Sequence, residues 1–121
     1  MRFVDVQGFC IRLDKQVEFQ TWLIKNEERI RNSYPEGIEY GGIYVAVFSS
    51  EKNAGEYFGL DTLDSYAAMD RSAAVAKDPD SEYAKVSQEF YQFIDTDRSA
   101  GSSHMLLKSV VDATIVDAPA P

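Results

Sequence analysis

The chain has 121 residues, of which 45% are hydrophobic and 12% aromatic, a composition typical of one globular domain and not of a disordered chain. Twenty acidic residues against 12 basic ones give a formal net charge of −8. This charge disfavours nucleic acid and anionic membranes as partners, because both are bound through clusters of basic side chains. The single cysteine, Cys10, excludes an intrachain disulfide. The sequence shows neither a signal peptide nor an apolar run of roughly 20 residues, so we expect no membrane association and a cytoplasmic location.

The first half of the sequence predicts a strand, a helix and a hairpin. Residues 3–13 alternate as a strand does, and Val4, Val6 and Gly8 are expected to face the helices. Asp14 is expected to cap a helix with one apolar stripe. The stripe consists of Phe19, Trp22, Leu23, Asn26 and Ile30. The runs 38–49 and 56–60 are expected to pair as a hairpin, joined by a turn over 50–54.

The second half predicts two helices and a final strand. Asp61 or Thr62 is expected to cap a short helix. Asp78-Pro79 predicts the start of a longer helix, because Asp is a favoured cap and Pro is favoured at the first helical position. Residues 103–116 predict the last strand and 117–121 a flexible tail. We therefore expect a single domain over residues 1–116.

This order predicts an α+β, ferredoxin-like βαββαβ fold, in which a four-stranded antiparallel sheet has its helices on one face. The face left without helices is expected to be rich in large apolar side chains. These are Phe3, Phe9, Ile11, Tyr40, Tyr44, Phe48, Leu106 and Val110. Such a face is too apolar for open solvent, so we expect a homodimer in which a second copy covers it.

Three segments resemble the dimeric α+β barrel superfamily, which includes antibiotic-biosynthesis-monooxygenase-like and NIPSNAP-like proteins. They are the strand 42–48, the strand and short helix 57–66, and the aromatic-rich helix before the last strand. The resemblance implies two sheets facing each other across a barrel, with a ligand pocket between each sheet and its helices or loops. Members include cofactor-free oxygenases of aromatic polyketides and quinones, haem-degrading enzymes and isomerases. The fold alone therefore does not select a chemistry.

The candidate catalytic residues are His104, Tyr44 and Asn26. His104 is the only histidine, and imidazole is the side chain best suited to proton transfer near neutral pH. Its alternative role is that of a partly exposed residue at a strand end. Asn26 lies on an apolar stripe, where its amide is either a satisfied buried group or a polar group in a pocket. A lone histidine lacks partners at metal-ligand spacing, so no metal is expected.

The candidate ligand-binding residues are aromatic side chains and one charged pair. The aromatic residues suit a flat, apolar ligand, although residues at such spacing also form ordinary cores. They are Trp22, Tyr40, Phe48, Tyr57 and Tyr66. Asp5 and Lys108 lie on strands expected to be neighbours, where they would form an ion pair that fixes register or perturbs a pKa.

Two functions remain open from the sequence. The first is a cofactor-independent oxygenase acting on an aromatic or quinone-like compound. The second is a non-catalytic ligand-binding or assembly module, because no acid–base pair is recognisable. Haem degradation is a minor alternative, since the predicted helices contain no histidine to serve as an axial ligand. Glycine-rich nucleotide motifs and the serine-hydrolase motif are absent from the sequence.

Overall fold

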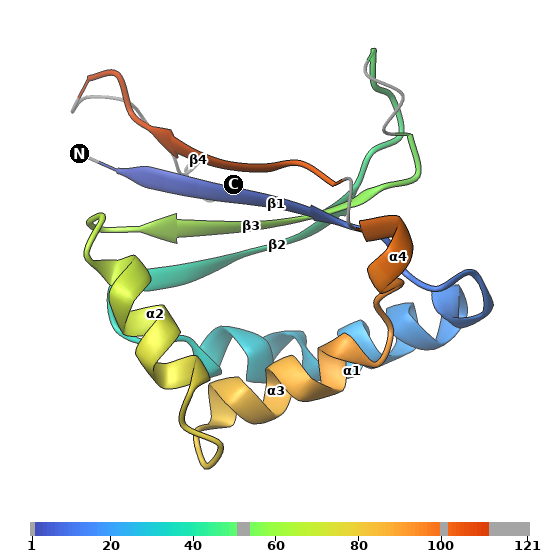
Figure 1. Ribbon diagram of the computed structural model, residues 1–121, viewed down its shortest axis with the longest axis horizontal. Coiled ribbons are helices and arrows are strands. Elements are labelled where there is room, and N and C mark those ends of the chain that lie inside the picture. The colour runs from blue at the N-terminus through green and yellow to red at the C-terminus, as the bar shows by residue number, and fades with distance from the viewer. Residues whose placement is uncertain (1, 51–53, 100–101, 112–121) are drawn as a thin grey trace, which may run out of the picture.

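The computed structural model describes residues 2–50, 54–99 and 102–111. Four strands form one antiparallel sheet in the order β2-β3-β1-β4. The strands are β1 (Phe3–Phe9), β2 (Ile38–Val45), β3 (Tyr57–Leu63) and β4 (His104–Lys108). The helices are α1 (Gln16–Ser33), α2 (Ala68–Ala76), α3 (Glu82–Tyr91) and α4 (Thr96–Ser99). The first three helices lie on one side of the sheet and leave the other side bare (Figure 1).

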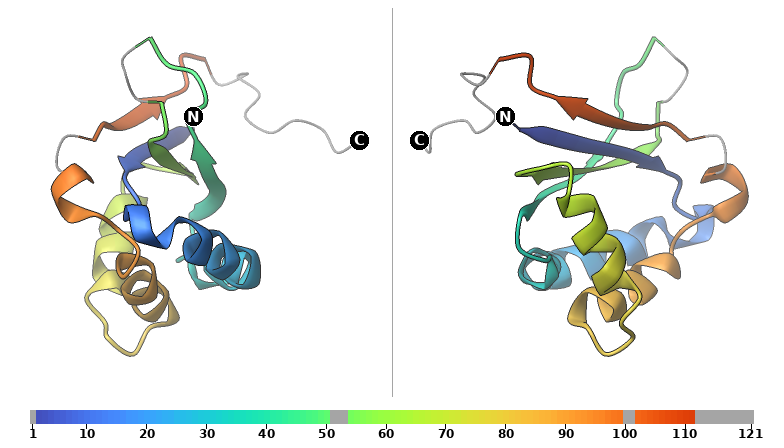
Figure 2. Two further views of the ribbon diagram at one scale, coloured as in Figure 1. Left: turned by 90° about the vertical axis from the view of Figure 1, so that its right-hand side faces the viewer. Right: turned by 60° about the vertical axis from the view of Figure 1, so that its left-hand side comes forward.

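This arrangement confirms the predicted α+β fold, with all long helices on one face. Figure 2 shows the same two layers from two further directions. Residues 112–116 of the predicted last strand, and the predicted tail 117–121, lie outside the described residues. None of the described helices is long and apolar enough to cross a membrane.

Helix α1 begins after the predicted cap, because a 3₁₀ turn over Leu13–Lys15 precedes it. Lys15 occupies the cap position without a side-chain hydrogen bond, and Asp14 instead forms an ion pair with Arg12 at 3.5 Å. The prediction of an Asp14 cap is therefore wrong. The predicted stripe of α1 is confirmed, since Phe19 and Ile30 are buried.

Helix α3 also begins later than predicted, at Glu82. The Ser81 hydroxyl accepts a hydrogen bond from the Ala84 backbone N–H at 3.1 Å and caps the helix. The Asp78 carboxylate accepts from the backbone N–H of Asp80 at 3.0 Å in the preceding turn. The Asp78-Pro79 pair thus belongs to the turn and does not start the helix.

The largest boundary error concerns Asp61 and Thr62, which are strand residues and not helix caps. Strand β3 continues to Leu63, and α2 begins only at Ala68. Asp61 is paired with Asp5 on one side and with Tyr40 on the other. The strand continues past the predicted end at residue 60 because it has a hydrogen-bonded neighbour on both sides.

The register of the sheet determines which side chains face the helices, because directly paired residues share a face. Phe9 is buried against Phe19 of α1, so its row faces the helices. The helix-facing rows, written in sheet order, are Ile38–Leu63–Phe3–Lys108, Tyr40–Asp61–Asp5–Leu106 and Ile43–Gly59–Gln7–His104. The bare face carries Val4, Val6, Phe58, Leu60, Thr62, Met105 and Leu107.

The predicted faces of β1 and β4 are therefore reversed. Phe3, Phe9 and Leu106 lie on the helix side, whereas Val4 and Val6 lie on the bare side. Ile11, predicted on the bare face, is 1% exposed and bridges to Ile94 beyond the end of β1. Both faces of β1 carry apolar side chains, Phe3 and Phe9 on one and Val4 and Val6 on the other, so alternation alone cannot orient the strand.

A bulge in β2 separates two tyrosines that were predicted to share a face. Tyr40 pairs with Asp61 and Ile43 with Gly59, so β2 uses one residue more than β3 over this interval. Gly42 accommodates the bulge with a φ of 109°, in the region that favours glycine. Tyr40 consequently faces the helices, and Tyr44, paired with Phe58, lies on the bare face as predicted.

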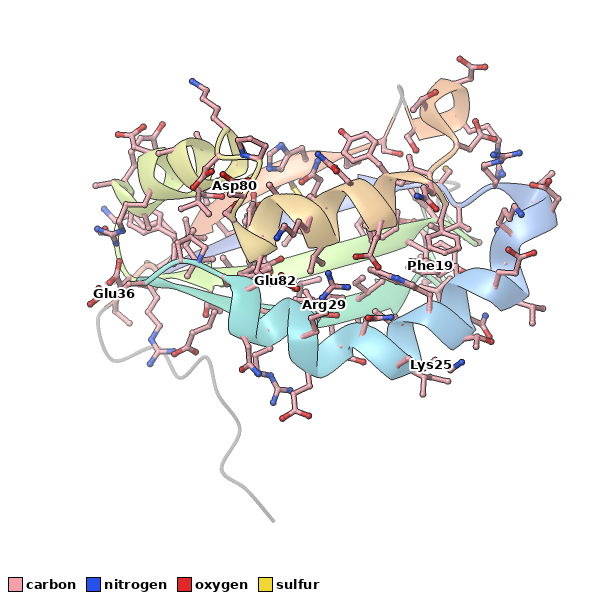
Figure 3. All side chains as sticks on the ribbon, turned by 90° about the horizontal axis from the view of Figure 1, so that it is seen from below. Phe19, Lys25, Arg29, Glu36, Asp80 and Glu82 are labelled. Carbon is pink, nitrogen blue, oxygen red and sulfur yellow. The ribbon has the colours of Figure 1, made fainter. Side chains whose placement is uncertain are left out.

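The core lies at one end of the sheet, between β1 and the two long helices. Phe9, Ile11 and Phe19 form its buried centre, and Phe90 meets both phenylalanine rings edge-on. Helices α1 and α3 are also linked at their surface (Figure 3), where Arg29 forms ion pairs with Glu82 and Glu89. This end of the molecule is well packed, and the space between sheet and helices lies further along the strands.

Candidate functional site

A cavity of about 280 Å³ lies between the sheet and helices α1 and α3. Its walls are mostly aromatic and aliphatic, and its polar atoms come from a few side chains. The lining consists of Gln7, Phe9, Ile30, Ser33, Tyr34, Tyr40, Ile43, Gly59, Asp61, Tyr83, Val86, Ser87, Phe90, Tyr91 and Ile94. Gln7 and Tyr91 are exposed, so the cavity reaches solvent between β1 and α3.

Gly59 contributes to this space by lacking a side chain. It lies in the helix-facing row of β3, between Ile43 and Gln7. A Cβ atom at this position would meet no atom closer than a Phe9 ring carbon at 3.9 Å. The sheet therefore has a depression where any other residue would project into the cavity.

Asp61 is the carboxylate in the lining of the cavity, and its environment favours the protonated form. Burial raises the pKa of Asp61 from 3.8 to about 6, and the nearby Asp5 carboxylate adds to the rise. Two hydrogen bonds oppose it, one from the Tyr34 hydroxyl at 3.3 Å and one from the backbone of Gly41. Asp61 can therefore gain or lose a proton near neutral pH, as a general acid or base must.

A cluster of three tyrosines adjoins this carboxylate through the Tyr34 hydroxyl. The Tyr34 ring meets the rings of Tyr40 and Tyr83 edge-on, at centroid distances of 5.7 and 5.3 Å. Burial raises the pKa of Tyr34 and of Tyr40, and the charge of Asp61 adds to both shifts. Tyr34 and Tyr40 therefore stay neutral at physiological pH and can donate hydrogen bonds to a ligand oxygen or to Asp61.

His104 and Asp5 lie beside the cavity on the same face of the sheet. The His104 Nε2 atom is 2.6 Å from an Asp5 carboxylate oxygen. The His104 side chain is 50% exposed and the Asp5 side chain 17%, so the pair joins the surface to the interior. Asp5 is in turn paired directly with Asp61 across the β1–β3 ladder.

Comparison with known proteins identifies this architecture. No protein-family model matches the sequence, and no curated protein matches it either. Among solved structures, a NIPSNAP family protein from Agrobacterium tumefaciens is similar with a TM-score of 0.64 at 14% identity, over 97% of this chain and 100% of that one. An uncharacterised NIPSNAP domain protein from Burkholderia xenovorans has a TM-score of 0.65 at 12% identity, over 93% and 99% of the two chains.

The chain has a NIPSNAP-like fold. A Nitrosomonas europaea protein, described as a candidate antibiotic biosynthesis monooxygenase, shares it with a TM-score of 0.57 at 10% identity, over 92% of each chain. The predicted likeness to this superfamily is thereby confirmed for the fold. Sequence identities this low indicate a shared fold but not a shared activity, so any chemistry has to be argued from the residues of the cavity.

Within this NIPSNAP-like fold, Tyr40 is the predicted site residue that lines the cavity. His104 and Asp5 adjoin it through Asp61. Lys108 is paired with Phe3, so the expected Asp5–Lys108 pair is replaced by Asp5–His104.

The other predicted site residues lie outside the cavity lining. The Asn26 side chain donates to the Trp22 backbone carbonyl at 2.8 Å on α1, and Trp22 packs against the core. Tyr57 packs there too, with its hydroxyl donating to the Gln16 side chain at 2.6 Å. Tyr44, Phe48 and Tyr66 are exposed by 55%, 86% and 69%. The functional roles proposed for these residues stay predictions.

Five residues of the cavity lining were not predicted as site residues from the sequence: Gln7, Tyr34, Gly59, Asp61 and Tyr83. A usable signal existed in β3, where Tyr57, Gly59, Asp61 and Leu63 alternate with Phe58, Leu60 and Thr62 as a single strand does. Reading Asp61 as a helix cap hid this alternation. Within the described part of the chain, no group of three or more His, Cys, Asp or Glu residues is arranged to hold a metal ion.

Proposed function

We propose that the cavity binds a small, uncharged aromatic molecule and that Asp61 removes a proton from it. One observation carries this proposal: a carboxyl group with a pKa of about 6 lies inside an aromatic-walled cavity of about 280 Å³. Ligand pockets usually range from roughly 300 to 1,000 Å³, so this one suits a compact ring system.

The charge of the lining argues against an anionic ligand. Among the described lining residues none is lysine, arginine or histidine, and Asp61 supplies a negative charge when ionised. A carboxylate or phosphate ligand would therefore be buried without a counter-ion, at a cost of several kcal/mol. A phenol or an aromatic ketone avoids this cost, because it can hydrogen-bond to Asp61 or Tyr34 while its ring packs against Phe9 and Phe90.

The reaction that fits this site is oxygenation without a cofactor. The Asp61 carboxylate accepts a proton from an activated C–H group of the substrate, leaving a carbanion. The carbanion gives one electron to dioxygen, and the two radicals join in a C–O bond to form a peroxide that takes the proton back from Asp61. Loss of a second proton from the same carbon then breaks the O–O bond, giving a ketone and water. The fold is shared with the Nitrosomonas europaea protein described as a candidate monooxygenase, which supports this choice.

We further propose that a second copy of the chain covers the bare face of the sheet. The register places Val4, Val6, Leu60, Met105 and Leu107 in adjacent rows there. Met105 and Leu107 are 49% and 48% exposed, and Tyr44 beside Phe58 is 55% exposed. An apolar sheet face of this kind marks an interaction surface, and a symmetric contact buries it on both copies. Sedimentation equilibrium at micromolar concentration should give a mass of two chains; a single-chain mass would refute this assembly.

The function is tested with anthrone, an aromatic ketone that carries an activated CH₂ group. Calorimetry should show that the wild-type protein binds anthrone. The protein should also convert anthrone to anthraquinone and water with uptake of one O₂ for each anthrone molecule. Asp61→Asn should bind it and lose at least 100-fold in rate, because the proton acceptor is gone. Asp70→Asn, an exposed change of the same kind on α2, should leave the rate unchanged. Binding without turnover in the wild type would favour a ligand-binding module, and no binding at all would overturn the proposal.

A further inference from the structure

We propose that His104 is a positioning residue that sets the charge of Asp61 through Asp5. The inference rests on the proposed function in one respect only, namely that Asp61 is the group that removes the proton from the substrate. Its geometric basis is independent of any substrate, because the three residues are connected across adjacent strands of one sheet face.

The connection begins at the surface and ends in the cavity. His104 on β4 contacts the carboxylate of Asp5 on β1 at 2.6 Å. Asp5 and Asp61 are direct cross-strand partners with both side chains on the helix side. Paired residues of this kind have Cβ atoms about 5 Å apart, so two ionised carboxylates there repel each other strongly.

The other titratable groups around Asp61 do not offer a comparable switch. The groups that act on it from the neighbouring elements are Asp5 on β1, Tyr34 after α1 and Tyr40 on β2, and Tyr83 on α3 contacts the Tyr34 ring. The pKa values of Tyr34 and Tyr40 are raised, so both remain neutral over the physiological range. Glu27 and Arg31 of α1 act on the Tyr40 hydroxyl. Among these described groups, Asp5 is the carboxylate that acts directly on Asp61.

The charge of His104 decides how strongly Asp5 acts. A protonated imidazole at hydrogen-bond distance cancels most of the Asp5 charge, and Asp61 then ionises more readily. A neutral imidazole leaves the Asp5 charge uncompensated, and Asp61 holds its proton to higher pH. Half of the His104 side chain is exposed, so a change of charge at this surface position acts on the carboxyl group inside the cavity.

The test is a titration of the Asp61 carboxyl carbon by NMR in protein labelled with ¹³C-aspartate, with Asp61→Asn used to assign the signal. Asp5→Asn should lower the Asp61 midpoint by about one pH unit, because the repelling charge is gone. His104→Gln should raise the midpoint by about half a unit, and His104→Arg, a permanent cation, should lower it. Opposite shifts from two substitutions at one position would not arise from a merely structural role.

Lys108→Gln provides the control, because it removes a cation from the same face of β4 at a position paired with Phe3. It should leave the midpoint within about 0.2 units. Equal midpoints in wild type, Asp5→Asn and both His104 variants would overturn the proposal. The titration needs no ligand, so the two proposals can fail separately. If the wild type does not turn over anthrone but the Asp5 and His104 variants shift the Asp61 midpoint as expected, only the proposed function is refuted.

Discussion

The strongest test of the site is the effect of Asp61→Asn on stability at different pH values. Asp61 has a pKa of about 6 in the folded protein, against an ordinary value of 3.8. Between these values the folded protein binds more protons than the unfolded chain, so ionising Asp61 lowers stability as the pH rises. At about 1.4 kcal/mol for each pH unit, the penalty is about 1 kcal/mol at pH 4.5 and about 3 kcal/mol at pH 8.

Asparagine has the same shape as aspartate and stays neutral, and its side-chain oxygen can still accept from the Tyr34 hydroxyl. We therefore expect the wild type to lose about 2 kcal/mol of unfolding free energy relative to Asp61→Asn when the pH is raised from 4.5 to 8. Urea denaturation followed by circular dichroism measures this difference, and Asp70→Asn serves as the exposed control. Parallel stability profiles for Asp61→Asn and wild type would show that the burial argument is incorrect.

Three further substitutions test the cavity, the core and a helix cap. Gly59→Leu should fill the cavity and weaken anthrone binding at least tenfold. It should also raise the unfolding free energy by about 1 kcal/mol, because glycine is unfavourable within a strand. Thr62→Leu, on the opposite face of β3, should leave binding intact. Phe19→Ala should lower the unfolding free energy by about 3–5 kcal/mol, since Phe19 is fully buried, and a loss below 1 kcal/mol in urea denaturation would contradict the assigned core. Ser81→Ala should cost about 1 kcal/mol by the same assay, and an unchanged stability would mean that the Ala84 N–H finds another acceptor.

The order of the main elements could be predicted from the sequence because the helices α1 and α3 each bury apolar side chains at helical spacing. In α1, Phe19 and Ile30 fall on the predicted stripe and are buried. The strand faces could not be predicted in the same way. The alternation in β1 places Val4 and Val6 on one face and Phe3 and Phe9 on the other, and both sets are apolar. Only the packing against helices decides which set is inside.

The candidate site was harder to predict because it depends on two long-range features. Asp61 followed by Thr62 has the local pattern of a helix start, and only pairing with both β1 and β2 keeps these residues in a strand. The contact between Asp5 and His104 spans 99 positions in the chain. Adjacent strands were predicted correctly, but the choice between His104 and Lys108 depends on a register that no local pattern encodes.

The glycine bulge at Gly41 and Gly42 divides β2 into two parts whose side chains of the same alternation lie on opposite faces of the sheet. On one side of it, Tyr40 helps to enclose the cavity; on the other, Tyr44 belongs to the outer surface of the sheet. We therefore expect substitutions at Tyr44 to affect the proposed dimer and leave the proposed ligand site intact, and substitutions at Tyr40 to do the reverse. Deleting one of the two glycines would remove the extra residue of the bulge. Tyr40 and its strand neighbours would then point to the opposite face of the sheet, away from the cavity.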